Sequence, residues 1–114
     1  MASFELIYDA DDDVLEVTFA TFDETFARTL PLNDNIVLYT DMSINAAWGL
    51  SLYRYSRLLQ VSETHLDNLR ELPDEAAQHI LTVLRRPPLS AFITLLDTIN
   101  FYAIIKSPSL RELF

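Results

Sequence analysis

Two short segments near the start of the chain alternate between apolar and polar residues, and this alternation constrains the fold most. Phe4–Tyr8 and Val14–Phe19 come close to placing an apolar side chain at every second position, which is the period of a half-buried strand. The segment between them, Asp9–Asp13, holds four aspartates, the residue type whose carboxylate bonds its own backbone in turns. We therefore predict a β-hairpin over residues 4–19.

Three more strands are expected before residue 54. A third strand, roughly Thr25 to Leu30, should end near Pro31, because proline cannot donate to a strand ladder. Ile36–Tyr39 is β-branched and aromatic enough for a fourth strand, and Ala46–Tyr53 for a fifth. The first half is thus predicted to be an antiparallel β-meander of about five strands.

The apolar spacing becomes helical after Tyr53, which predicts two or three helices. Tyr55, Leu58 and Leu59 indicate a helix of about two turns, and a second helix should carry leucines at positions 66, 69 and 72. A third helix should run over residues 74–86, where acids in the first turn and bases in the last complement the helix dipole.

The tail allows two interpretations, one helix or two strands. Ala91–Leu96 and Phe101–Ile105 are rich in aromatic and β-branched residues, and the polar break between them favours a second hairpin. Ser107 and Pro108 then offer the start of a short helix over residues 109–113. The predicted fold class is α+β: an N-terminal meander, two or three helices, a C-terminal hairpin and a short terminal helix.

The length of 114 residues suits one domain, residues 1–114. Half of the residues are apolar and 13 are aromatic, more than so small a core is expected to hide. A homodimer would cover the surplus, so we predict one.

Several classes of protein are excluded by what the sequence lacks. Without cysteine there is neither a disulfide framework nor a thiolate metal site, so the cytoplasm is the expected compartment. The first residues have no basic start followed by an apolar run, which argues against an export signal. The most apolar stretch, Leu89–Ile105, is interrupted by Asp97 and Asn100, so no membrane span is predicted.

The net charge of −9 is distributed unevenly. Residues 1–53 contain ten acidic residues and only Arg28 as a base, whereas residues 54–114 contain seven of each sign. Nucleic acid is not expected as a direct partner, because phosphate binding is driven by Lys and Arg. An acidic sheet face that binds a basic protein is the leading hypothesis, and the residues assigned to it are Asp11, Asp12, Asp13, Glu16, Asp23 and Glu24.

The chain contains in order a Tyr-Asp-x-x-x-Asp-x-Leu hairpin, a hydrophobic strand and a Gly-aliphatic pair, which are Tyr8, Asp9, Asp13 and Leu15, then Asn35–Leu38, then Gly49 and Leu50. Through these motifs residues 4–52 resemble a short bacterial domain family of unknown function, family 2283. The family usually has an acidic residue after that pair, where this chain has Ser51. The resemblance implies a small antiparallel sheet with attached helices, a weak link to partners of small toxins, and no established chemistry.

The aspartate run at residues 9–13 is a candidate calcium site. An EF-hand loop that starts at Asp9 would have Val14 where glycine makes the sharp turn and Ala20 where a bidentate glutamate closes the site. A solvated hairpin turn fits this composition better. No metal and no cofactor are therefore predicted.

Enzymatic activity has little support from motifs. The chain has no G-x-S-x-G elbow and a single glycine, Gly49, which cannot build a phosphate loop. Glu75 and His79 lie four residues apart and would share a helix face. The alternative hypothesis is a small-ligand or metal-dependent activity centred on this pair; a non-enzymatic interaction or regulatory module is preferred.

Overall fold

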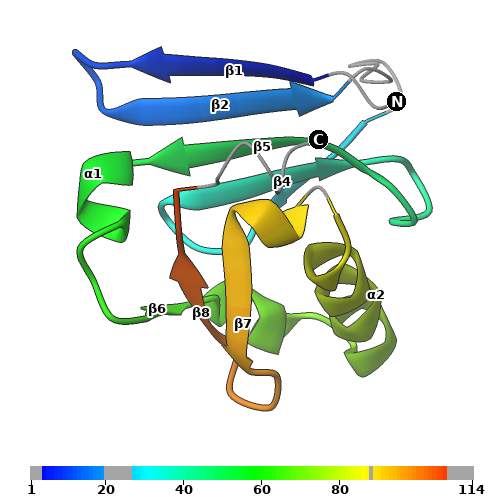
Figure 1. Ribbon diagram of the computed structural model, residues 1–114. Helices are drawn as coiled ribbons and strands as arrows, with labels where there is room; N and C mark the ends of the chain where they lie inside the picture. The colour runs from blue at the N-terminus through cyan, green and yellow to red at the C-terminus, as the bar shows by residue number, and fades with distance from the viewer. Residues whose placement is uncertain (1–3, 20–26, 88, 108–114) are drawn as a thin grey trace. The chain divides into compact units, whose positions relative to one another are not determined.

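The computed structural model describes residues 4–19, 27–87 and 89–107 (Figure 1). The chain divides into two compact units, residues 1–56 and 57–114. The described residues form eight strands in two antiparallel sheets, and a single α-helix longer than one turn.

The first unit is a five-stranded antiparallel sheet. Its strands are β1 (Phe4–Asp9), β2 (Val14–Phe19), β3 (Arg28–Pro31), β4 (Ile36–Thr40) and β5 (Ala47–Tyr53). The predicted first hairpin is confirmed, because β1 pairs with β2 from Phe4 opposite Phe19 to Asp9 opposite Val14. The predicted third strand is confirmed from Arg28; its first positions, 25 and 26, lie outside the described residues.

The strand order is β1-β2-β5-β4-β3, so the predicted meander is wrong. The last strand in sequence, β5, lies between β2 and β4 and pairs with both (Figure 1). Residues 49–52 of β5 are all buried, as suits a strand with neighbours on both sides. β3 has no buried residue and ends in Pro31, which suits a sheet edge because proline lacks the donor that a central strand needs.

One face of this sheet is apolar. Side chains alternate across a strand, and the register aligns Leu15 with Leu52 and Val17 with Leu50, followed by Ile36 and Leu38 on β4. All six side chains are at most 7% exposed. The register slips at Trp48, since Tyr39 is opposite Gly49 while Thr40 is opposite Ala47. β5 therefore contains a bulge next to Gly49.

The second unit combines a small sheet with a helix. The boundary between the units falls within α1 (Tyr55–Leu58). The elements that follow are β6 (Thr64–His65), the 3₁₀ helix η1 (Asp67–Glu71), α2 (Asp74–Arg85), η2 (Leu89–Ala91), β7 (Ile93–Asp97) and β8 (Tyr102–Ile105). The sheet order is β6-β8-β7. α2 packs on β7 and buries Ala77, Ile80, Leu81, Val83 and Leu84. It ends before Pro87, whose ring disfavours helical backbone at Arg86.

The predicted α+β class with two or three helices is wrong, because the described chain is mostly antiparallel sheet. The leucines at 66, 69 and 72 recur every three residues, and this is the period of a 3₁₀ helix, not the 3.6 of an α-helix. The chain forms η1 there, with Leu66 and Leu69 buried. α1 stops after one turn: Leu59 and Val61 beyond it are exposed, so no apolar stripe continues.

The predicted C-terminal hairpin is confirmed by β7 and β8, which pair from Ile93 opposite Ile105 to Asp97 opposite Tyr102. The expected short helix at 109–113 lies outside the described residues. Within the residues that the structure describes, no helix has both the length and the apolar character needed to cross a membrane.

Candidate functional site

The face of the first sheet opposite its apolar core carries acids and hydroxyl groups. We call it the acidic face and define it by the alternate strand residues that the register brings together: Glu5, Ile7 and Asp9 of β1, Val14, Glu16 and Thr18 of β2, Ser51 and Tyr53 of β5, Val37 and Tyr39 of β4, and Thr29 and Pro31 of β3. None of these residues is Lys or Arg. The face is therefore negative as well as polar.

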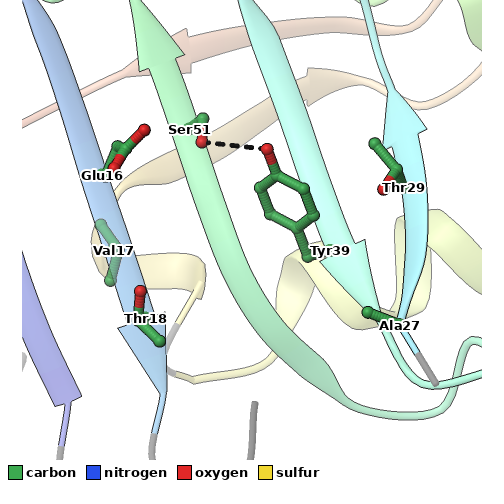
Figure 2. A pocket seen from close by; sticks show the side chains of 7 residues that line it. All are labelled: Glu16, Val17, Thr18, Ala27, Thr29, Tyr39 and Ser51. Atoms are coloured by element: carbon green, nitrogen blue, oxygen red, sulfur yellow. Dashed lines mark hydrogen bonds between the residues drawn. The ribbon is translucent and has the colours of Figure 1, made fainter. Parts of the chain in front are cut away.

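A concavity of about 440 Å³ lies on this face (Figure 2). Side chains from four strands line it, among them Glu16, Thr18, Thr29, Tyr39 and Ser51. The Ser51 hydroxyl donates a 3.3 Å hydrogen bond to the Tyr39 oxygen, and Figure 2 shows this pair next to Glu16. One carboxylate among hydroxyl groups suits a cation that also donates hydrogen bonds. The described lining offers no histidine to act as a general base.

A second concavity, of about 280 Å³, shares Glu16 with the first. It extends toward β1 and is lined by Ile7, Asp9, Asp12, Val14, Glu16 and Tyr53. Three carboxylates around one hollow would favour a positively charged group. The described residues nevertheless contain no group of three or more His, Cys, Asp or Glu placed to hold a metal ion. The hollow thus suits an organic cation, such as a Lys or Arg side chain, better than a bare metal.

The six residues assigned to the acidic face from the sequence take different positions. Glu16 is exposed and lies at the junction of the two concavities. Asp11 and Asp12 are exposed in the β1–β2 turn. Their main-chain N–H groups donate hydrogen bonds to Oδ1 of Asp9 at 3.0 and 3.3 Å. This is the solvated aspartate turn that the composition predicts. Asp23 and Glu24 lie outside the described residues.

Asp13 has a structural role in the first unit. Its carboxylate accepts the Tyr8 hydroxyl at 2.6 Å, the main-chain N–H of Ser56 at 3.0 Å and the Ser56 hydroxyl. Its backbone is left-handed, with φ of 56°, a conformation that aspartate tolerates better than most residues. The hydrogen bond to Asp13 raises the pKa of Tyr8, with smaller contributions from desolvation and from the charges of Asp13 and Asp9.

Sequence reasoning missed part of this surface. Glu5 and Asp9 belong to the acidic face, and the alternation that places Phe4, Leu6 and Tyr8 together was a sufficient signal for them. Tyr39 and Ser51 meet Glu16 only because β5 is inserted between β2 and β4. No local pattern in the sequence predicts that β5 lies between β2 and β4.

The alternative pair, Glu75 and His79, lies on α2 one turn apart, and both side chains are exposed. The described part of the chain supplies no third ligand to them. The other histidine, His65, is half-buried on β6, and its ring stacks on Tyr102 with centroids 4.7 Å apart. A packing role for His65 accounts for this geometry.

Comparison of the chain with protein-family models, with curated proteins and with solved structures gives no match to any of them. The resemblance of residues 4–52 to family 2283 therefore stays a prediction that rests on its motif residues.

Proposed function

We propose that this chain is a protein-interaction module whose acidic face binds a positively charged partner. The observation that carries the proposal is the charge of that face: it presents Glu5, Asp9 and Glu16 and no Lys or Arg. A face of one sign steers an oppositely charged partner and discriminates against partners of like charge. The two concavities give the partner's basic side chains places to enter.

Hexalysine titrated into ¹⁵N-labelled protein tests the proposal with a defined probe. At about 0.02 M salt the amide signals of residues on the acidic face should shift, and at about 0.5 M salt the shifts should largely vanish because exposed charges are screened. Shifts that persist at high salt, or that gather on α2, would overturn the electrostatic proposal.

Matched charge-neutral variants locate the site. Glu16→Gln should weaken hexalysine binding roughly two- to fivefold, as expected for one exposed ion pair. Glu71→Gln removes the same charge from an exposed position on η1 in the second unit, and it should leave the affinity unchanged. Equal losses in both variants would show that only the net charge matters.

The oligomeric state is part of the same proposal. We expect two copies to associate through the second unit, since residues 57–114 have six bases against seven acids while residues 1–56 have two bases against ten acids. The hairpin of β7 and β8 exposes Leu96 (49%) and Ile99 (83%). Light scattering should give a dimer that Ile99→Asp weakens and Met42→Asp, an equal change in the first unit, does not; a monomeric parent chain refutes the dimer.

A further inference from the structure

The outer edge of β1 has the features of a strand that accepts another strand. β1 is the terminal strand of its sheet, is six residues long and contains no proline. Among the described residues, only β2 pairs with it. The side chains of Leu6, Ile7 and Tyr8 are 41%, 52% and 49% exposed. Edge strands are usually short, charged, interrupted by proline or covered; of these protections, the part of the chain that the structure describes gives β1 only the charges of Glu5 and Asp9.

The opposite edge of the same sheet lacks these features. β3 has four residues and ends in Pro31, which has no N–H to donate. An added strand would make fewer main-chain hydrogen bonds there. β1 is thus the edge at which the sheet can be extended.

The register along β1 determines what an added strand must carry. Residues directly opposite each other on neighbouring strands share a face and interact. Glu5 and Asp9 lie on the acidic face four residues apart, with Ile7 between them, while Leu6 and Tyr8 lie on the other face. A strand opposite residues 5–9 would therefore need basic residues at both ends and three apolar residues in the middle.

A second copy of β1 does not fit this pattern. If two copies paired about Ile7, with their acidic faces continuous, Glu5 of each copy would lie opposite Asp9 of the other. Like charges directly opposite on neighbouring strands are destabilising. A basic-ended strand would meet opposite charges at the same two places, and the side chain opposite Asp9 could enter the concavity lined by Asp9, Asp12 and Glu16.

We propose that β1 binds an extended segment of a partner protein by β-strand addition, and that this segment has the pattern basic, apolar, apolar, apolar, basic. The inference rests on the proposed function and specifies its partner. Main-chain hydrogen bonds along β1 provide affinity, and the alternate side chains provide specificity. Because the pattern reads the same in both directions, it holds for a parallel and for an antiparallel added strand.

A capped peptide with the core Lys-Val-Ile-Val-Lys, labelled for fluorescence polarisation, is the probe. Two further peptides carry N-methyl groups either on residues 1, 3 and 5 of the core or on residues 2 and 4. Every second N–H of an added strand points to its neighbour, so one methylated peptide should lose at least tenfold in affinity and the other should stay close to the parent. Equal affinities for all three peptides, or no binding of the parent, overturn strand addition.

A charge reversal tests the assigned register. Glu5→Lys should weaken binding of the parent peptide and strengthen binding of a peptide in which one terminal Lys of the core is Glu, while Glu71→Lys should change neither. The outcomes separate the two proposals: equal binding of both methylated peptides that is lost at high salt refutes strand addition and leaves the acidic face in place. Binding that is indifferent to salt and to Glu5→Lys refutes the acidic face instead.

Discussion

The hydroxyl of Tyr8 donates a 2.6 Å hydrogen bond to Oδ1 of Asp13. Asp13 also bonds the N–H and the hydroxyl of Ser56, 43 positions later in the chain. The carboxylate therefore ties the first hairpin to the segment that follows β5, and the ring of Tyr55 lies 6.1 Å from that of Tyr8. Within the aspartate run, Asp9 thus holds the turn and Asp13 links the hairpin to residue 56, while the side chains of Asp11 and Asp12 are exposed to solvent.

Replacing Asp13 with asparagine should bring the pKa of Tyr8 back toward the ordinary 10.0. Asparagine tolerates left-handed backbone as aspartate does, so the turn should persist while the charge is lost. Titration of the tyrosine ¹³Cζ signals from about pH 8 to about pH 12 would follow this change. A pKa that is raised in the folded state stabilises the fold at pH values below the ordinary pKa, and this contribution is lost as the pH rises through the pKa of the folded state.

The matched control for that titration is Asp12→Asn, which removes an exposed charge from the same turn. Its Tyr8 signal should titrate as in the parent chain. An unchanged Tyr8 pKa in Asp13→Asn would mean that the hydrogen bond is absent in solution.

Asp97 makes the turn between β7 and β8 sensitive to acid. Its carboxylate accepts the N–H groups of Ile99 and Asn100 and the side-chain amide of Asn100, at 2.9 to 3.0 Å. The two bonds from Asn100 and the bond from Ile99 lower the pKa of Asp97 below its usual 3.8. A pKa that is lowered in the folded state stabilises the fold at pH values above the pKa of the unfolded state, and this contribution is lost as the pH falls through the pKa of the folded state.

Asp97→Asn should therefore have a lower Tm than the parent chain near neutral pH, and the difference should shrink as the pH falls from about 5 to about 2. Melting followed by circular dichroism across this range gives the measurement. Asp34→Asn removes a charge from another exposed turn and controls for net charge. A Tm difference for Asp97→Asn that is constant with pH would contradict the assigned role of the ionised carboxylate.

Local patterns in the sequence predicted the local elements well. The hairpin of β1 and β2 and that of β7 and β8 each join neighbouring segments through a turn in which an aspartate carboxylate accepts main-chain N–H groups. α2 is marked by Asp74 and Glu75 at its start and by Arg85 at its end. In these cases the signals and the contacts that they predict lie within a few residues of each other.

The features that depend on distant parts of the chain were not predictable in the same way. The place of β5 between β2 and β4 follows from its burial among residues distant in sequence, and the concavity of Glu16, Tyr39 and Ser51 depends on that place. The acidic character of the sheet could be located from charge counts, whereas its hollows could not. The predicted α-helix with leucines at 66, 69 and 72 was wrong for another reason, because a period of three residues and one of 3.6 residues are hard to separate over two turns.

Ile44 stores strain in the loop between β4 and β5. Its backbone is left-handed, with φ of 57°, which costs an L-amino acid roughly 1–2 kcal/mol and is a true outlier for a β-branched residue. The side chain is 5% exposed. The loop is held by Asp41, whose carboxylate accepts the N–H groups of Asn45 and Ala46 at 2.7 and 3.2 Å. Burial of Ile44 and these hydrogen bonds offset the strain.

The order of two substitutions at this position should reveal the strain. Ile44→Ala loses the buried side chain and keeps the left-handed cost, so it should lower the free energy of unfolding by about 2–4 kcal/mol. Ile44→Gly loses the same burial but removes the cost of the left-handed backbone, so its free energy of unfolding should be no lower than that of Ile44→Ala. Ile36 is a buried position inside β4. There the glycine variant should have a free energy of unfolding roughly 0.5–1 kcal/mol below that of the alanine variant. Urea unfolding of the four variants decides the matter: if glycine is worse than alanine by the same margin at both sites, Ile44 stores no strain.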